Sequence, residues 1–191
     1  MIHVIGINGS PHREGNTALL IGQVFQELEK AGIATEMVHL SGRKLMGCRA
    51  CFKCYENRDQ RCTIKDDLNE CIAGMVAADG IILGSPTYFT DVTAEMKALI
   101  DRAGMVAKAN DDMLRRKVGA AVVAVRRAGA LHAFDTLNHF FLIGQMTIPG
   151  SNYWNMAFGM NPGDVREDGE GMETMRILGE NMAFLLKKLH A

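Results

Sequence analysis

The sequence lacks the long hydrophobic runs and leader segments of membrane-bound and secreted proteins. No apolar run approaches the roughly 20 residues that a membrane-spanning helix needs. Residues 1–7 contain neither a basic segment nor an apolar stretch long enough for a secretion signal. We therefore expect that the protein does not associate with a membrane. We expect a cytoplasmic location, where thiols stay reduced.

An excess of positive charge is also missing. The 191 residues include 21 basic and 22 acidic side chains, so the formal net charge is −1. Proteins that bind nucleic acids usually carry a basic excess that neutralises phosphates, so we expect no nucleic-acid partner. Prolines number only four, and neither repeats nor low-complexity segments are visible. With 48% hydrophobic residues, the chain is predicted to fold as one domain over residues 1–191.

Apolar segments alternate with segments of helical periodicity, which is typical of a βαβ protein with a parallel sheet. The expected strands are residues 1–7, 33–40, 80–85, 117–125 and 146–148. The expected helices are residues 16–30, 66 or 67 to about 78, 92–107, 131–144 and 171–189. The remaining segments are a cysteine-rich loop at about 41–65 and a loop at 150–169, which opens the C-terminal segment 150–191. This pattern predicts a five-stranded, doubly wound three-layer sandwich that binds ligands at the carboxyl ends of its strands.

The loop between the first strand and the first helix, residues 9–17, is rich in small and polar residues. Unpaired N–H groups and a partial positive charge at a helix N-terminus suit phosphate. Side chains that can add donors or positive charge are Ser10, Asn16, Thr17 and either His12 or Arg13. The loop matches neither the Walker motif nor the dinucleotide fingerprint. It therefore predicts a site for a terminal monophosphate, the alternative being an ordinary capped turn.

The loop after the third strand, residues 84–91, places two aromatic residues and a proline at the same end of the sheet. Pro86, Tyr88 and Phe89 can form a flat apolar wall. The backbone N–H groups of Thr87 to Phe89 can donate to a planar heteroaromatic ring. Alternatively, the aromatic side chains pack beneath the next helix. The two loops together indicate a ligand with a phosphate and a ring at the switch point of the sheet.

These two loops carry a family resemblance. The segments GINGSPHREGNT and ADGIILGSPTYFTDVTAEMKALIDR resemble the NADPH-dependent FMN reductase family, which has the flavodoxin-like fold. The resemblance covers about residues 1–150 and implies a bound FMN, with its phosphate on Ser10, His12, Asn16 and Thr17. It implies a ring site made by Pro86, Thr87, Tyr88 and Phe89. The family also uses the loop after the fourth strand, which here contains Gly129 but departs from the glycine-rich form at Arg126 and Arg127.

Four of the five cysteines are closely spaced, as Cys48-x2-Cys51-x2-Cys54-x7-Cys62. This spacing resembles the compact run by which ferredoxins hold a [4Fe-4S] cluster. A zinc site with four thiolates and a set of free, redox-active thiols are the alternatives. Basic residues surround the motif and would stabilise an anionic cluster. The fifth cysteine, Cys71, has apolar neighbours and is predicted to be a buried structural residue.

The cysteine motif in a flavodoxin-like chain resembles the iron-sulfur flavoproteins, which are homo-oligomers that hold FMN and a [4Fe-4S] cluster and transfer electrons. The resemblance implies a flavin-dependent oxidoreductase that forms a dimer or tetramer, with NAD(P)H as a candidate donor and a ferredoxin-like electron partner. Two alternatives stay open: an NAD(P)H-dependent FMN or quinone reductase without a cluster, and a non-enzymatic thiol-based redox sensor. No acid–base residue is required, so no side chain is assigned as catalytic.

Overall fold

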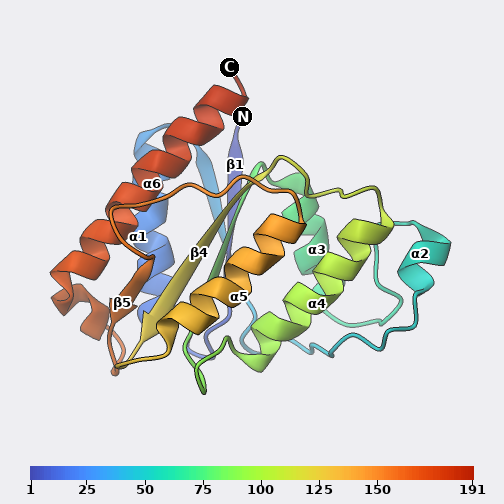
Figure 1. Cartoon of the computed structure of the whole chain (residues 1–191), viewed down its shortest axis with the longest axis horizontal. Helices are drawn as coiled ribbons and strands as arrows, with labels where there is room; N and C mark the ends of the chain where they lie inside the picture. The colour runs from blue at the N-terminus through green and yellow to red at the C-terminus, as the bar shows by residue number, and fades with distance from the viewer.

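The computed structural model describes residues 1–191, and its centre is a five-stranded parallel sheet (Figure 1). The strands are β1 (His3–Asn8), β2 (Ala34–His39), β3 (Gly80–Pro86), β4 (Val118–Val125) and β5 (Met156–Phe158). Their order across the sheet is β2-β1-β3-β4-β5. The strand order reverses between β1 and β3, which confirms the predicted doubly wound sheet.

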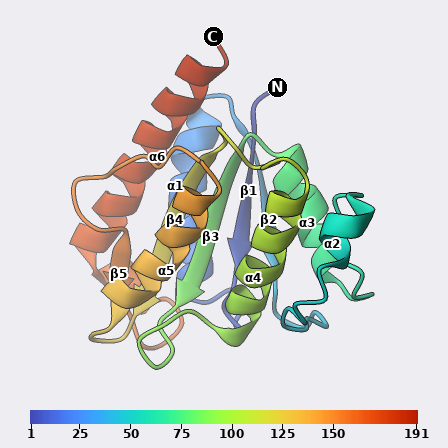
Figure 2. The same ribbon diagram turned by 45° about the vertical axis from the view of Figure 1, so that its right-hand side comes forward.

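Helices cover both faces of the sheet (Figures 1 and 2). One face carries α1 (Asn16–Lys30) and α6 (Gly169–Leu189), and the other carries α3 (Leu68–Ala77), α4 (Ala94–Ala109) and α5 (Ala130–Ile143). Two short helices lie within the long loops, α2 (Lys53–Asn57) and η1 (Asp164–Glu167). None of the helices combines the length and the apolar character needed to cross a membrane.

The side chains of the inner strands alternate between two apolar cores. Ile5 and Ile7 belong to the core beneath α3, α4 and α5, whereas Val4 belongs to the core beneath α1 and α6. Every residue of β4 is buried, since helices cover both sides of this strand. The strand ends are therefore held firmly from both faces, and the loops that leave them start from fixed positions.

The fifth strand lies elsewhere than predicted, and the assignment of residues 146–148 is wrong. Thr147 makes only an isolated bridge to the first residue of β4. Pro149 has no N–H to donate, and the chain leaves the sheet at this point. It returns as β5, which pairs with the last three residues of β4. The edge strand is thus interrupted, and residues 148–155 form a loop on the outside of the sheet.

The loops after β1 and β3 are tied together at the carboxyl edge of the sheet. The N–H of Gly9 donates to the carbonyl oxygen of Gly84 at 2.8 Å. Thr93, which caps α4, donates its hydroxyl to the carbonyl oxygen of Gly9 at 2.9 Å. Its own N–H donates to the hydroxyl of Ser85 at 3.1 Å. The start of α4 therefore fixes both loops at the switch point, where such folds bind ligands.

Candidate functional site

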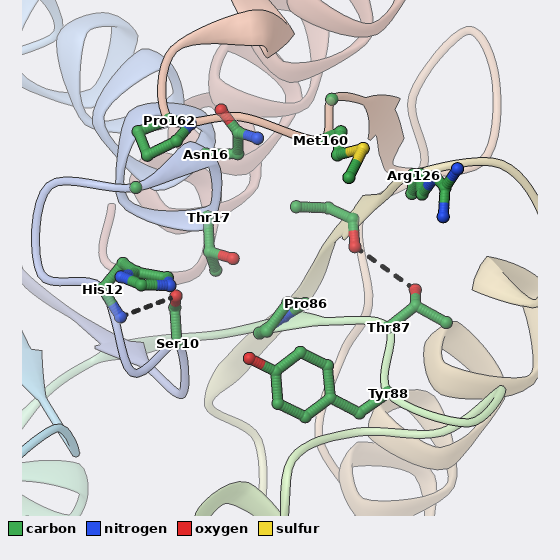
Figure 3. Close-up of a pocket in the computed structure, with 13 residues that line it drawn as sticks. Ser10, His12, Asn16, Thr17, Pro86, Thr87, Tyr88, Arg126, Met160 and Pro162 are labelled. Carbon is green, nitrogen blue, oxygen red and sulfur yellow. Dashed lines mark hydrogen bonds between the residues drawn. The ribbon is translucent and has the colours of Figure 1, made fainter.

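A pocket opens where β1, β3 and β4 end (Figure 3). The residues that line it are Ser10, His12, Gly15, Asn16, Thr17, Pro86, Thr87, Tyr88, Ala124, Arg126, Gly159, Met160 and Pro162. The structure thus brings together all of the predicted cofactor-binding residues except Phe89 and Gly129. That these residues bind the cofactor stays a prediction, but they share one site although their positions in the sequence are far apart.

Helix α1 begins at this pocket with unpaired N–H groups. Its N-cap is Gly15, no side chain caps the helix, and no acidic residue lies in the first turn. The first N–H groups of a helix have no partner within it, and the helix dipole adds a partial positive charge. A Cβ on Gly15 would lie 2.9 Å from the Cβ of His12, so the glycine also lets the loop fold closely. The arrangement fits the phosphate of FMN.

A chain of hydrogen bonds supports the loop between β1 and α1. The N–H of Ser10 donates to Oδ1 of the buried Asn8 at 2.9 Å, and the N–H of His12 donates to Oγ of Ser10 at 3.1 Å (Figure 3). Nδ2 of Asn8 lies 3.1 Å from Nδ1 of His39 on β2. Burial and the positive charges of Arg13 and Arg43 lower the pKa of His39, so the ring is neutral at pH 7 and can accept this bond.

Asn16 holds the segment after β5 against the pocket. Its Nδ2 donates to the carbonyl oxygen of Asn161 at 2.9 Å, and its Oδ1 accepts from the N–H of Gly163 at 2.8 Å. These bonds bring Met160 and Pro162 to the rim of the pocket (Figure 3). The side-chain amide of Asn16 is thus committed to protein contacts, while its backbone N–H stays at the helix start.

The wall after β3 differs in detail from the prediction. The N–H of Thr87 donates to the carbonyl oxygen of Ala124 at 2.9 Å, and the N–H of Tyr88 donates to that of Asp91 at 2.8 Å. The expectation that these two N–H groups donate to a ring is therefore wrong, because strand pairing and a tight turn already use them. Pro86 and the ring of Tyr88 still face the pocket (Figure 3).

Phe89 lies at the tip of a two-residue turn and does not line the pocket. Phe89 and Thr90 have φ angles of 47° and 66°, and the N–H of Asp91 returns to the carbonyl oxygen of Tyr88 at 3.0 Å. The side chain of Phe89 is fully exposed. Gly129, with φ of 87°, packs against Thr90, because a Cβ there would lie 2.9 Å from Cγ2 of Thr90. Gly129 therefore supports the turn and does not line the pocket.

The basic side chains that line the pocket are His12 and Arg126, and the guanidinium of Arg126 brings a positive charge to it. Arg13 lies outside the lining, and its guanidinium donates to the carbonyl oxygen of Ser41 at 3.4 Å. Of the lining residues that were not predicted, Arg126 lies in the loop already singled out after the fourth strand. Gly159 and Pro162 reach the pocket only because the chain returns after β5, and no local pattern marks them.

The four closely spaced cysteines form a second candidate site, packed against α4. Cys48, Cys51, Cys54 and Cys62 all line one small cavity, and none of its lining residues is shared with the first pocket. Cys54 is buried and Cys62 is half-buried, whereas Cys48 and Cys51 are exposed. No three His, Cys, Asp or Glu side chains of the chain are arranged to hold one metal ion.

The backbone around the cysteines turns its N–H groups toward sulfur. Ala50 and Phe52 have left-handed φ angles of 49° and 55°, and the N–H of Ala50 donates to Sγ of Cys48 at 3.4 Å. The N–H of Lys53 and the hydroxyl of Thr63 lower the pKa of Cys51. Donors directed at sulfur stabilise thiolates. The donor set therefore fits a cluster held by thiolates, whose several irons spread their ligands more widely than one ion does.

The two buried cysteines differ in their surroundings. Burial raises the pKa of Cys54, whose Sγ lies 3.8 Å from the carbonyl oxygen of Met105 on α4. Burial also raises the pKa of Cys71, which lies on α3 within the apolar core and lines neither site. The burial of Cys71 agrees with the prediction that it is structural.

Arg102 on α4 is a charged residue beside the cysteines that was not predicted from the sequence. Its side chain is fully buried and forms a two-fold ion pair with Asp66, with Nη1–Oδ2 and Nη2–Oδ1 distances of 2.6 and 2.9 Å. Burial opposes ionisation of Asp66, but the bonds from Arg102 and from the N–H of Met46 lower its pKa. A signal existed, because Arg102 continues the apolar stripe of Leu99 and Val106 at helical spacing.

Three comparisons relate the chain to known proteins. The model of the NADPH-dependent FMN reductase family matches residues 2–161. An iron-sulfur flavoprotein of Methanocaldococcus jannaschii is 40% identical over 96% of this chain and 97% of that protein. An iron-sulfur flavoprotein of Methanosarcina thermophila is 33% identical over 96% and 95%. NAD(P)H:quinone oxidoreductase from Methanothermobacter marburgensis superimposes with a TM-score of 0.69 at 16% identity, over 95% of this chain and 98% of that one, which shows a shared fold.

The family match extends from β1 to the segment after β5 that reaches the pocket. It confirms the resemblance that the two loops carry, and the structural neighbour confirms the α/β fold class. The chain belongs to the NADPH-dependent FMN reductase family, in the branch of the iron-sulfur flavoproteins, and it is by that membership a flavin-dependent oxidoreductase.

Proposed function

We propose that the first pocket binds FMN, with its phosphate at the start of α1 and its ring against residues 86–88. The observation that carries this proposal is the uncapped helix start, which shares one pocket with an apolar wall. The hydroxyls of Ser10 and Thr17 join the N–H groups of α1 as phosphate donors, and the imidazole of His12 offers a further N–H donor. Met160 contributes to the rim opposite Tyr88 (Figure 3).

Two of the predicted residues take indirect roles in this proposal. Asn16 positions the segment after β5 through its two bonds to that segment, in addition to offering its backbone N–H. Gly129 supports the turn that contains Thr90. Phe89 is fully exposed at the tip of this turn and makes no contact in the pocket. Asn16 and Gly129 shape the pocket, while Ser10, Thr17 and the wall make the contacts.

We propose further that the four closely spaced cysteines hold a [4Fe-4S] cluster. Their common cavity, the N–H groups directed at sulfur and the nearby guanidinium of Arg102 support it. Two relatives at 40% and 33% identity are named iron-sulfur flavoproteins, which supports it independently. Zinc is the alternative occupant that the experiment below distinguishes.

The function we infer is electron transfer. Bound FMN takes up two electrons together and releases them singly, and a [4Fe-4S] cluster carries one electron at a time. The family description names NADPH, so we take NAD(P)H as the candidate two-electron donor, and a ferredoxin-like protein suits the one-electron side. The residues of the chain bind and orient the cofactors and surround them with donors, and none is assigned an acid–base role. We infer a cytoplasmic location, where thiols stay reduced, and a homo-oligomer, as the resemblance to the iron-sulfur flavoproteins implies.

A reductase without a cluster is the second candidate function. One observation favours it, namely that no three potential ligands are arranged around a single point. In this case the thiols are free, and Cys51, exposed and with a lowered pKa, would be the most reactive of them. Such a thiol also suits the third alternative, a sensor of oxidants.

Anaerobic purification followed by measurement of FMN, iron, sulfide and zinc per chain tests these assignments. We expect one FMN with four irons and four sulfides, as the formula [4Fe-4S] requires. Cys54→Ser should lose the iron and keep the FMN. Cys71→Ser is the matched control, because it removes a buried cysteine outside the motif, and it should keep both.

Each outcome decides between the candidates. If zinc is found and iron is not, the cysteines hold a structural zinc ion and the assignment of a cluster is wrong. A yellow protein without metal that oxidises NADPH would establish the reductase without a cluster. A chain that binds neither FMN nor metal after reconstitution would overturn the proposal as a whole.

A further inference from the structure

The guanidinium of Arg102 connects the two ends of the cysteine loop. On the side before Cys48 it donates from Nη1 to the carbonyl oxygen of Met46 at 3.0 Å. On the side after the last cysteine of the motif it donates from Nη2 to the carbonyl oxygen of Ile64 at 3.3 Å and to Asp66. It thus spans both ends of the loop from a third element, α4.

Arg102 also contacts a cysteine directly. Its Nε donates to Sγ of Cys62 at 3.3 Å. With the two bonds to Asp66, each of the five N–H donors of the guanidinium has its own acceptor. Lysine has only three donors on one atom and cannot reproduce this fan of contacts. The side chain is fully buried, so water does not replace any of them.

The pairing with Asp66 holds the guanidinium in one orientation. Asp66 accepts two bonds from Arg102 and further bonds from the N–H groups of Met46 and Leu68, at 3.0 and 3.3 Å. A carboxylate with several donors fixes a planar fork in one plane. Because this pairing fixes the plane of the guanidinium, the N–H at Nε is directed at the sulfur of Cys62.

We infer that Arg102 is a positioning residue for the cysteine site: it holds Cys62 next to the other three cysteines and directs an N–H donor and a positive charge at its sulfur. This inference rests on the proposed cluster. Hydrogen bonds and positive charge at a ligand sulfur favour the reduced, more anionic form of a cluster. Arg102 should therefore raise the reduction potential of the cluster and slow its loss.

Two variants and one control test this role. Asp66→Asn/Arg102→Met removes both charges, so that neither is left buried alone, and Arg102→Lys keeps the charge but loses the fan of bonds. Arg58→Met is the matched control, because Arg58 lies between Cys54 and Cys62 but is exposed and pairs with Asp111. Circular dichroism and thermal unfolding establish that each variant is folded.

Three measurements follow on the anaerobically purified chains. The double variant should have a more negative cluster potential in a spectroelectrochemical titration. It should also lose iron to a chelator about 10- to 100-fold faster, the usual effect of removing an outer partner of a metal ligand. Arg102→Lys should lose iron faster with a smaller shift in potential, and Arg58→Met should behave as the wild type.

The third measurement is the rate at which Cys62 is alkylated, which mass spectrometry monitors. It is made on the chain as isolated, with or without a cluster. Faster alkylation of Cys62 in the double variant supports positioning. An unchanged potential together with unchanged protection of Cys62 would overturn the inference. A wild-type chain without iron would overturn the cluster and the effect on its potential, while the protection of Cys62 would still decide whether Arg102 positions the thiol.

Discussion

His39 makes the support of the loop between β1 and α1 dependent on pH. Its ring accepts from Asn8, which holds the N–H of Ser10, and a protonated ring can no longer accept. Burial and two nearby arginines lower its pKa below the ordinary value of 6.5. The unfolded chain therefore binds this proton at a higher pH than the folded chain does. Its contribution to stability is complete above about pH 6.5 and is lost as the pH falls from there through the lower folded pKa.

Urea unfolding at pH values above and below 6.5 checks this expectation. The free energy of unfolding should decrease as the pH is lowered below 6.5, by no more than about 1.4 kcal/mol per pH unit, which is the limit for one proton. His39→Gln should flatten this dependence. His132→Asn changes an exposed histidine on α5 and serves as the control, which should keep the pH dependence of the wild type. An identical slope for wild type and His39→Gln would assign the dependence to other groups.

Arg102 also matters for stability, because removal of one partner of a buried ion pair leaves the other charge alone. Arg102→Met should lower the free energy of unfolding by about 3–5 kcal/mol. Asp66→Asn in addition should restore most of the loss. Lys97→Met on the same helix breaks the exposed pair with Asp101 and should cost about 1 kcal/mol or less. Equal losses for Arg102→Met and Lys97→Met in urea unfolding would contradict the role assigned to the buried pair.

At the scale of elements, the start of α1 lacks a side-chain cap, which leaves its first N–H groups available for the proposed phosphate. Gly15→Asp would supply the missing cap and add a negative charge where the phosphate is proposed to lie. The added Cβ would lie 2.9 Å from the Cβ of His12, so the new cap offsets only part of the strain, and we expect the thermal stability of the chain without FMN to fall slightly. We expect FMN affinity to fall about 30-fold, from up to ~2 kcal/mol of charge interaction with the helix end. Gly22→Asp places the same residue in open space on the same helix and should leave affinity unchanged. Fluorescence titration with FMN measures the affinity of both variants. Equal affinities for Gly15→Asp and Gly22→Asp would place the phosphate elsewhere.

Elements with strong local patterns are the part of the fold that the sequence predicts well. The predicted helix 16–30 has those bounds in the structure, since its apolar face repeats at helical spacing between Gly15 and Gly32. The strand expected at 146–148 fails, because a short apolar run does not show whether its backbone finds a partner along its length. β5 has only three residues, and its pairing with the end of β4 depends on the path of the whole loop.

The same limit applies to the sites. The residues of the first pocket that come from loops 9–17 and 84–91 follow from the sequence, because both loops leave adjacent strands. The contacts of Asn16 with Gly163 join residues far apart in the chain, and no local pattern predicts them. The N–H groups of Thr87 and Tyr88 are used by neighbours that only the fold brings near. Arg102 carried a readable signal, a charge in an apolar stripe, which points to a buried partner.

At the scale of the whole molecule, a set of apolar side chains remains uncovered beside β5. Leu142 at the end of α5 and Tyr153 and Trp154 in the loop 148–155 line one hollow, with 61, 53 and 49% of their surface exposed. The rings of Tyr153 and Trp154 pack edge to face at 4.6 Å and present a broad apolar surface. Apolar clusters of this kind on a surface are typical of interfaces between proteins. We expect the proposed homo-oligomer to bury this one.

Trp154→Glu should therefore shift the chain toward the monomer in sedimentation velocity, because a charge in an apolar interface is strongly unfavourable. Phe184→Glu is the control, as Phe184 is 65% exposed on α6, outside this hollow. Trp154 is the only tryptophan, so its emission reports on this surface alone. Dilution of the wild-type chain should move that emission to longer wavelength as the oligomer dissociates and water reaches the ring. A variant that sediments like the wild type, together with an emission that does not change on dilution, would place any interface on another face of the molecule.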